Sequence, residues 1–310
     1  MANAPITSAA ASLGSSGLNS LLTYFMDSFE SQKRNRNSIL IHCNTDASAL
    51  VAQQGQTVTI PLYATTASSL ITDGDAIVGD DSTGSTSSVT LNKHRATKFS
   101  LTQVAQALDG NKVVNGLLQG RINGVLNDIE TDVCSVVTSG FTTNTVGTYN
   151  SAITEANATL AMGNLFAQKV PEGELVALVH PSVNAWQALV QIPEFADYQN
   201  TGMVSQNNQA NYGSIGQYWH GARWFMSQGV NKSGTSVDNF VMHKNAICVA
   251  MRAFDAPMAP GVQAVPMNID GVALQVLLQW NGDRLADEMV VHALYGYAVG
   301  EEKFGALFKS

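Results

Sequence analysis

Seven aliphatic residues recur at intervals of three or four and form the strongest helical signal in the chain. They are Val114, Leu118, Ile122, Val125, Ile129, Val133 and Val136. Their mean spacing is close to the 3.6 residues per turn of an α-helix that buries one face. The pattern predicts a helix from about Asn111 to Thr138 and allows a shorter helix before Asp109.

Three glycines, Gly116, Gly120 and Gly124, lie four residues apart on this predicted helix. Each glycine destabilises a helix by about 1 kcal/mol relative to alanine. Three aligned glycines therefore predict that another backbone packs closely against them. Arg121 and Asp128 exclude a membrane-spanning helix dimer, in which this spacing is common.

Two strand-like segments precede the helix. In "QTVTIPLY" the residues Val58, Ile60 and Leu62 alternate on one face, and Pro61 indicates an edge or a strand end. In "VTLNKHRATKFSL" the alternation of apolar residues resumes. The two segments predict an extended hairpin, which is marginally stable in water when isolated.

The connection between these strands, from Ala64 to Ser88, has 25 residues and no helical period. A loop of this length is uncommon in a compact domain unless it is functional or disordered. Only 13% of the chain is charged, yet this connection carries four acidic residues, Asp73, Asp75, Asp80 and Asp81. We expect this connection to form a polar tongue that has a function outside the apolar core of its own subunit.

The other segments predict a mixture of helices and strands. Near the N-terminus, Leu18, Leu21, Leu22, Phe25 and Phe29 follow a helical period behind an Ala/Ser/Gly-rich arm. A helix so short has no core of its own and must dock on the body or on a neighbour. Further helices are expected at "ANATLAMGNLFAQ" and at "HPSVNAWQALV", with Pro181 in its first turn, and a buried strand at "GELVALV". The segments "GARWFMSQGV" and "FVMHKNAICVAM" read as strands or a strand and a short helix, and "GVALQVLLQW" with "MVVHALYGYAV" as a C-terminal hairpin.

Composition excludes some classes of protein. The chain has 310 residues, of which 16 are basic and 24 acidic, giving a net charge of −8. This balance argues against a surface that neutralises phosphates. No apolar run is long enough to span a membrane, and no signal peptide is evident, so we expect synthesis and retention in the cytoplasm. Polarity comes from Ser, Thr, Asn and Gln, which suits burial against other protein.

Catalytic, cofactor-binding and metal-binding motifs are not found. There is no phosphate loop, dinucleotide fingerprint or nucleophile elbow, and the histidines are too far apart for a local zinc site. Cys43, Cys134 and Cys248 are predicted to be reduced, packed thiols. His42 and Cys43 are adjacent in a segment expected to be extended, so their side chains would point to opposite sides. "DGDAIVGDD" lacks the residue types of an EF-hand, with Ile77 at its fifth position.

The order of these elements resembles the major capsid proteins of tailed bacteriophages with the Hong Kong 97-like shell fold. The resemblance rests on "GQTVTIPL", "VTLNKHRATKFSLT", "NKVVNGLLQGRINGVLNDIETDV", "ELVALVHPSVNAWQAL", "GSIGQYWHGARWFMSQGV" and "NFVMHKNAICVAMR" in that order. It implies an α+β fold with an N-terminal arm, an extended β-hairpin loop, a long spine helix, and peripheral and axial domains. The implied divisions are an arm at 1–45, the loop at 46–100, the peripheral domain with the spine at 101–150, the axial domain at 151–255, and a return to the peripheral domain at 256–310.

The resemblance also implies a function and a set of partners. The chain would assemble into hexamers and pentamers of an icosahedral shell around double-stranded DNA, contacted non-specifically. It would be made in the host bacterial cytoplasm, with a separate scaffolding protein, a portal protein and a decoration or cement protein as partners. The tongue would lie over a neighbouring subunit, which would supply its partner surface. The expected inter-subunit contacts are Asp73, Asp75, Asp80, Asp81, Lys93, Lys98, Phe25 and Phe29.

Two other functions stay open at this stage. One is an encapsulin-type nanocompartment shell, which has the same fold and would need a cargo. The other is a cytoplasmic hydrolase or lyase with dispersed site residues. That reading would require perturbed side chains gathered in one deep pocket.

Overall fold

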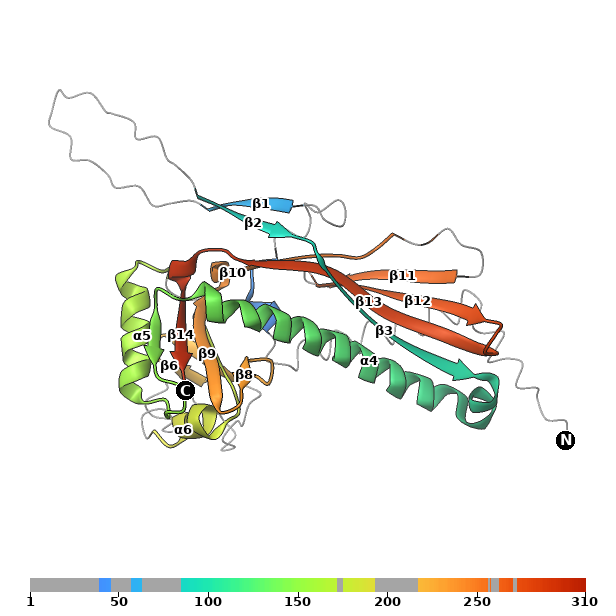
Figure 1. The fold of residues 1–310 in the computed structure, drawn as a ribbon, viewed down its shortest axis with the longest axis horizontal. Coiled ribbons are helices and arrows are strands. Elements are labelled where there is room, and N and C mark those ends of the chain that lie inside the picture. The colour runs from blue at the N-terminus through green and yellow to red at the C-terminus, as the bar shows by residue number, and fades with distance from the viewer. Residues whose placement is uncertain are drawn as a thin grey trace, which may run out of the picture.

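The computed structural model describes residues 39–45, 57–62, 85–171, 175–192, 217–255, 257, 262–269 and 272–310. Figure 1 shows an elongated body in which one long helix, α4, runs from a long antiparallel sheet at one end to a compact lobe at the other. Phe25, Phe29 and the four acidic residues of the tongue lie outside the described residues.

The long helix α4 extends from Gln103 to Gly140 and has 38 residues. At 1.5 Å per residue it is about 57 Å long. The predicted helix is confirmed, and the shorter helix before Asp109 is part of it. Ile122, Ile129 and Val133 are fully buried, as the periodicity predicts, and α4 therefore presents one apolar face to the body.

A five-stranded antiparallel sheet forms the elongated part of the body. Its order is β10-β13-β12-β11, and β3 also pairs with β13. Met289, Val291 and Tyr295 of β13 belong to the same core cluster as the buried face of α4. The predicted C-terminal hairpin is confirmed as β12 and β13. The strands are β3 (Lys93–Thr102), β10 (Ile247–Arg252), β11 (Val262–Ile269), β12 (Val272–Asn281) and β13 (Ala286–Val299).

A seven-stranded sheet forms the compact lobe, in the order β4-β14-β9-β5-β7-β6, with β8 paired to β9. The pairs β5–β7 and β4–β14 are parallel and the others antiparallel. Sequence patterns predicted β5, β7 and β9 but not β14. The strands are β4 (Thr145–Gly147), β5 (Leu175–Val179), β6 (Gln217–Trp219), β7 (Ala222–Met226), β8 (Lys232–Ser233), β9 (Ser236–His243) and β14 (Gly305–Lys309).

Short helices complete the lobe. Helix α5 (Glu155–Ala167) is capped by Thr154, whose Oγ1 accepts a hydrogen bond from the Asn157 backbone N–H at 3.3 Å. A π-helical turn at Val183–Gln187 continues into α6 (Ala188–Val190). Pro181 was expected in the first turn of this second helix, but Ser182 already precedes the helix as its cap. A 3-10 turn at Lys244–Ala246 joins β9 to β10, so the segment "FVMHKNAICVAM" forms two strands.

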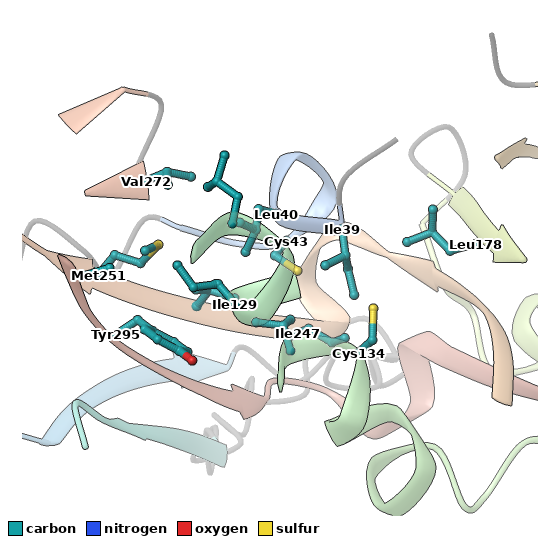
Figure 2. Packing of buried hydrophobic residues seen from close by; sticks show 14 of the residues in the cluster. Ile39, Leu40, Cys43, Ile129, Cys134, Leu178, Ile247, Met251, Val272 and Tyr295 are labelled. Atoms are coloured by element: carbon teal, nitrogen blue, oxygen red, sulfur yellow. The ribbon is translucent and has the colours of Figure 1, made fainter. Parts of the chain in front are cut away.

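One apolar core joins the two sheets around the C-terminal half of α4. It includes Ile129 and Cys134 of α4, Tyr295 of the five-stranded sheet and Leu178 of the seven-stranded sheet. Figure 2 shows Ile39, Leu40 and Cys43 pointing into this cluster from the short helix α3 (Ile39–His42) and the residue after it. The shared core fixes the orientation of the long sheet relative to the lobe.

Candidate assembly surface

The hairpin formed by β1 (Thr57–Leu62) and β2 (Ser85–Thr90) is antiparallel, and its register runs from Thr57 opposite Thr90 to Leu62 opposite Ser85. The predicted connection extended to Ser88, but Ser85–Ser88 belong to β2. The intervening residues 63–84, which include the four acidic residues, lie outside the described part of the chain.

The base of this hairpin packs on its own subunit. Val58, Val89 and Leu91 are buried in a cluster with Cys248 of β10 and Leu294 of β13. Figure 1 shows β1 and β2 lying along one side of these two strands. These buried residues flank the tongue that was expected at Ala64–Ser88, so the strands that carry it belong to the core of their own subunit. The expectation that the tongue itself has no core in its own subunit stays a prediction, because most of it lies outside the described residues.

The hairpin passes close to the backbone of the body at Gly296 of β13. A Cβ atom on Gly296 would lie 2.2 Å from the Thr90 carbonyl oxygen and 3.1 Å from the Leu91 backbone nitrogen. A hydrogen bond from Ser87 Oγ to the Val299 carbonyl oxygen, at 2.7 Å, holds the next part of β2. The hairpin can therefore pack this closely on β13 only because residue 296 has no side chain.

The segment "VTLNKHRATKFSL" was predicted as one returning strand of the tongue, but it divides at Leu91 and Asn92. The part before the break, in β2, pairs with β1, whereas β3 pairs with β13 from Lys93 opposite Tyr295 to Thr102 opposite Ala286. Lys93 and Lys98 therefore lie in the sheet of the body rather than on the hairpin. The division follows from packing, because fully buried Leu91 belongs to the cluster under the hairpin.

Lys98 has a partner within its own chain. Its Nζ lies 2.9 Å from Glu288 Oε1 on β13. The same carboxylate accepts hydrogen bonds from Asn281 Nδ2 at 2.9 Å and Gln279 Nε2 at 3.0 Å. The hydrogen bond from Lys98 has the largest effect on the pKa of Glu288, and together with these two amides it lowers that pKa to about 2. Whether Lys93 and Lys98 also contact another subunit stays a prediction.

The depressed pKa of Glu288 predicts an acid-dependent loss of stability. The ionised carboxylate is favoured in the folded chain, so its contribution is complete above the ordinary pKa of 4.5 and is lost as the pH falls towards 2. We expect Glu288→Gln to flatten the pH dependence of the unfolding free energy in this window. Chemical denaturation of both proteins between pH 5 and about 2.5 tests this. An unchanged slope in the variant would contradict the assignment.

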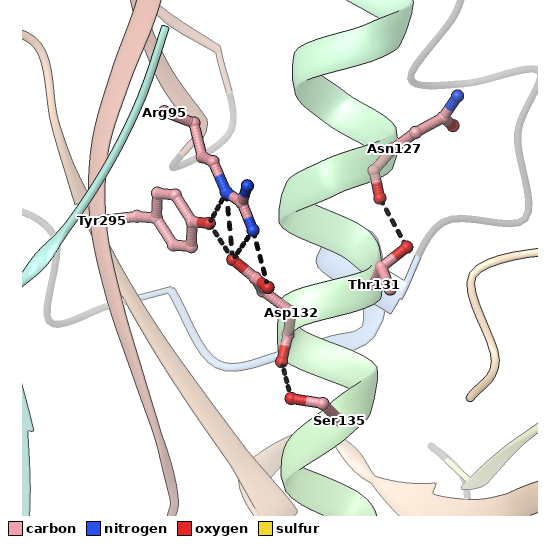
Figure 3. A network of polar contacts seen from close by, with 6 residues as sticks. All are labelled: Arg95, Asn127, Thr131, Asp132, Ser135 and Tyr295. Carbon is pink, nitrogen blue, oxygen red and sulfur yellow. Dashed lines mark hydrogen bonds and ion pairs between the residues drawn. The ribbon is translucent and has the colours of Figure 1, made fainter. Parts of the chain in front are cut away.

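A polar network attaches β3 and β13 to α4 below the hairpin. Arg95 Nη2 of β3 lies 3.0 Å from both carboxylate oxygens of Asp132, and Tyr295 Oη of β13 donates a hydrogen bond to Asp132 Oδ2 (Figure 3). Burial has the largest effect on the pKa of Tyr295 and raises it, and the hydrogen bond to Asp132 raises it further. The hydroxyl therefore stays protonated and can donate. The three residues belong to β3, β13 and α4. The network therefore holds β3, which follows the hairpin in the chain, against the long helix.

Two glycines of α4 do not pack as predicted. Gly120 and Gly124 are exposed, and beyond the helix's own backbone nothing lies within 4 Å of a Cβ built on either. For these two glycines, and within the described part of the chain, the prediction that another backbone packs closely is wrong. The reason is that the helix buries the opposite side, on which Ile122, Val125 and Ile129 lie.

Gly120→Ala is therefore expected to stabilise the isolated subunit rather than overpack it. The added methyl group meets open space, and alanine is favoured over glycine in a helix by up to about 1 kcal/mol. A rise in the thermal unfolding midpoint of the unassembled protein is the expected result. A fall would mean that the glycine face is covered.

The three cysteines are buried and form no disulfide, as the sequence predicted for packed thiols. Burial, first, and the nearby Cys248 raise the pKa of Cys43, so its thiol is a poor nucleophile. His42 ends a short helix rather than lying in an extended segment, and its ring stacks on Phe225 with centroids 5.3 Å apart. Burial is the main reason that the pKa of His42 is lowered to about 4, and the positive charge of Arg223 adds to the effect. Neither residue is placed for thiol–imidazole chemistry.

Groups that could carry metal chemistry are dispersed in the described part of the chain. Within it, no three His, Cys, Asp or Glu side chains are grouped so that they could hold a metal ion. The histidines with lowered pKa, His42, His180 and His292, come from different elements. Among the helices of that same part, none has the length and apolar character needed to cross a bilayer.

Comparisons with known proteins find likeness in structure but not in sequence. No family model matches the chain, and no curated protein matches it. Among solved structures, one from Mycobacterium phage Che8 superposes with a TM-score of 0.57 at 12% identity, covering 86% of this chain and 89% of the other. The capsid structure of the cyanophage P-SCSP1u gives 0.57 at 12% identity over 83% and 84%. A virus-like particle from Pyrococcus furiosus gives 0.50 at 11% identity over 93% and 97%.

The chain has the Hong Kong 97-like fold. This confirms the predicted α+β fold class, with α4 as the spine helix and β1–β2 as the base of the extended hairpin. The predicted N-terminal arm lies mostly outside the described residues. At 12% identity the likeness is one of fold, and the residues that would make contacts between Hong Kong 97-like subunits are not assigned by it.

Proposed function

We propose that this protein is the major capsid protein of a tailed bacteriophage, which assembles into the icosahedral shell around a double-stranded DNA genome. The observation that supports the proposal most strongly is the superposition on a phage capsid structure over more than four fifths of both chains. The protein acts as a building block and not as an enzyme. Its low charge content, 13% of residues, suits extensive burial between copies.

The anchored hairpin provides a physical basis for assembly. Its base is held by Val58, Val89 and Leu91, by the close contact at Gly296 and by the bond from Ser87. Because the base is already held in place, a contact made further along the hairpin costs less conformational entropy on binding, which favours association. We propose that residues 63–84 contact a neighbouring subunit, with Asp73, Asp75, Asp80 and Asp81 at that contact, and that Phe25 and Phe29 contact another.

The domain assignment follows the two sheets. In this proposal the five-stranded sheet and α4 form the peripheral domain, and the seven-stranded sheet with α5 and α6 forms the axial domain. The sheets do not follow the divisions expected from sequence at every point. β10 lies in the five-stranded sheet although it precedes residue 256, and β14 lies in the seven-stranded sheet although it follows it.

The proposal includes partners and a location. Copies of the chain would form hexamers and pentamers, with a separate scaffolding protein, a portal protein and a decoration or cement protein. The product would be part of the virion, made in the host bacterial cytoplasm, and its inner surface would contact DNA non-specifically.

Expression of the chain, alone and with candidate scaffolding proteins from the same genome, tests the proposed function. Sedimentation and negative-stain microscopy should show closed icosahedral shells. Shells that enclose a specific protein cargo in cells free of phage would instead indicate an encapsulin-type nanocompartment. Small particles under all conditions would contradict a shell function.

A further inference from the structure

The outward face of α5 is exposed and nearly free of charge. The exposed residues after its first position are Ala156, Thr159, Leu160, Gly163, Phe166 and Ala167. Leu160 is 56% exposed and Phe166 40% exposed. The one charged residue of the helix is Glu155, at its first position, and Lys169 follows the helix. The charges thus lie at the two ends of an apolar surface.

The opposite face of α5 is already occupied. Ala158, Ala161, Met162 and Leu165 are buried in the core of the lobe, together with Phe308 of β14 and Val146 of β4. A surface helix ordinarily places charged residues opposite its buried face. The outward face of α5 has no charged residue after Glu155 and exposes two large apolar side chains, Leu160 and Phe166, which indicates that protein covers this face in the functional state.

The shape of this face also permits close approach. A Cβ atom on Gly163 would meet nothing within 4 Å, so the backbone there is open between Leu160 and Ala167. Phe166 lies beside the turn between β6 and β7, where its ring is 3.3 Å from a Cβ built on Gly221. Figure 1 shows α5 at the outer end of the lobe, with the described strands on its inner side only.

We infer that the outward face of α5, centred on Leu160 and Phe166, is a contact with a second copy of this chain. The inference rests on the proposed shell function. Each copy carries a net charge of −8, so copies repel one another wherever acidic surfaces meet. Two copies can meet at this face with little repulsion, because its single acidic residue lies at one end. Removing the apolar area of the face from water then stabilises the contact.

Other occupants fit this face less well. A nucleic acid would require basic residues, and the exposed positions from Ala156 to Ala167 include none. A bilayer surface would favour a helix with basic residues along its polar side, but the other side of α5 is core. The chemistry of the face matches another protein surface low in charge.

Thiol labelling of a Leu160→Cys variant tests the contact. Because Cys43, Cys134 and Cys248 are each no more than 2% exposed, the new thiol would label much faster with maleimide than they do. We expect labelling of assembled particles to be slower than that of unassembled subunits by about tenfold or more, which corresponds to an opening free energy of about 1.4 kcal/mol. Equal labelling rates in shells and subunits would overturn the inference and leave the shell function standing.

A pair of substitutions provides the matched control. Leu160→Lys places a charge on the exposed face and should leave the subunit folded while lowering the yield of particles at least tenfold. Leu160→Met keeps the face apolar and should assemble normally. Normal particles from the lysine variant would also overturn the inference. If the Leu160→Cys chain forms only small oligomers that still protect the new thiol, the contact stands and the shell function fails.

Discussion

Replacing residues 63–84 by Asn-Gly should yield a folded subunit that does not form closed shells. Leu62 and Ser85 are paired, so a two-residue turn between them continues the existing ladder. The variant retains Val58, Val89 and Ser87, and with them the attachment of the hairpin to the body. Obligate interfaces commonly bury more than about 2,000 Å², so loss of one long contact should strongly impair assembly.

Circular dichroism and sedimentation separate the two parts of this prediction. Helix content should equal that of the unaltered chain, and the particle peak should be absent. As a matched control, a Gly/Ser linker of the same length tests whether the particular residues between 63 and 84 matter or only their reach. Normal closed shells from the Asn-Gly variant would contradict the assembly role. An unfolded product would mean that these residues belong to the core of their own subunit.

Gly296→Ala should displace the hairpin from the body. The new Cβ would lie 2.2 Å from the Thr90 carbonyl oxygen, and a backbone atom cannot rotate away as a side chain can. Overpacking of this kind costs about 1–3 kcal/mol or more. We therefore expect a lower unfolding midpoint, faster proteolysis between β1 and β2, and a loss of closed shells.

Two further variants keep this prediction testable if Gly296→Ala fails to fold. Ser87→Ala removes the hydrogen bond to Val299 and should weaken the same attachment by about 1 kcal/mol without a clash. Gly120→Ala adds the same methyl group where nothing lies within 4 Å and should not lower the unfolding midpoint. If Gly296→Ala melts and assembles like the unaltered chain, the close contact between β2 and β13 is wrong.

Much of the fold could be predicted from local pattern. The spacing of Ile122, Ile129 and Val133 was sufficient to identify α4, because a helix repeats its buried face every 3.6 residues whatever it packs against. The C-terminal hairpin was predicted by two long apolar segments and a turn between them. The fold class followed from the resemblance of this order of elements to that of Hong Kong 97-like capsid proteins.

The candidate assembly surface was harder to predict, because its decisive contacts join residues far apart in sequence. Gly296 meets Thr90 across about two hundred positions, and no local pattern distinguishes it from other glycines in strands. The exposed face of α5 escaped notice for a related reason. "ANATLAMGNLFAQ" predicts a helix, and only the structure shows which of its apolar residues the core leaves exposed.

The sequence alone therefore determined the long helix and most of the longer strands, their order, the absence of recognisable catalytic motifs and a composition suited to contact with other protein. The tertiary structure decided where "VTLNKHRATKFSL" divides, that Lys98 pairs with Glu288, and that Gly120 and Gly124 of α4 face open space. The physical reason is the range of the forces involved. Backbone periodicity and turn preference act over a few residues, whereas burial and close packing depend on which distant segments meet.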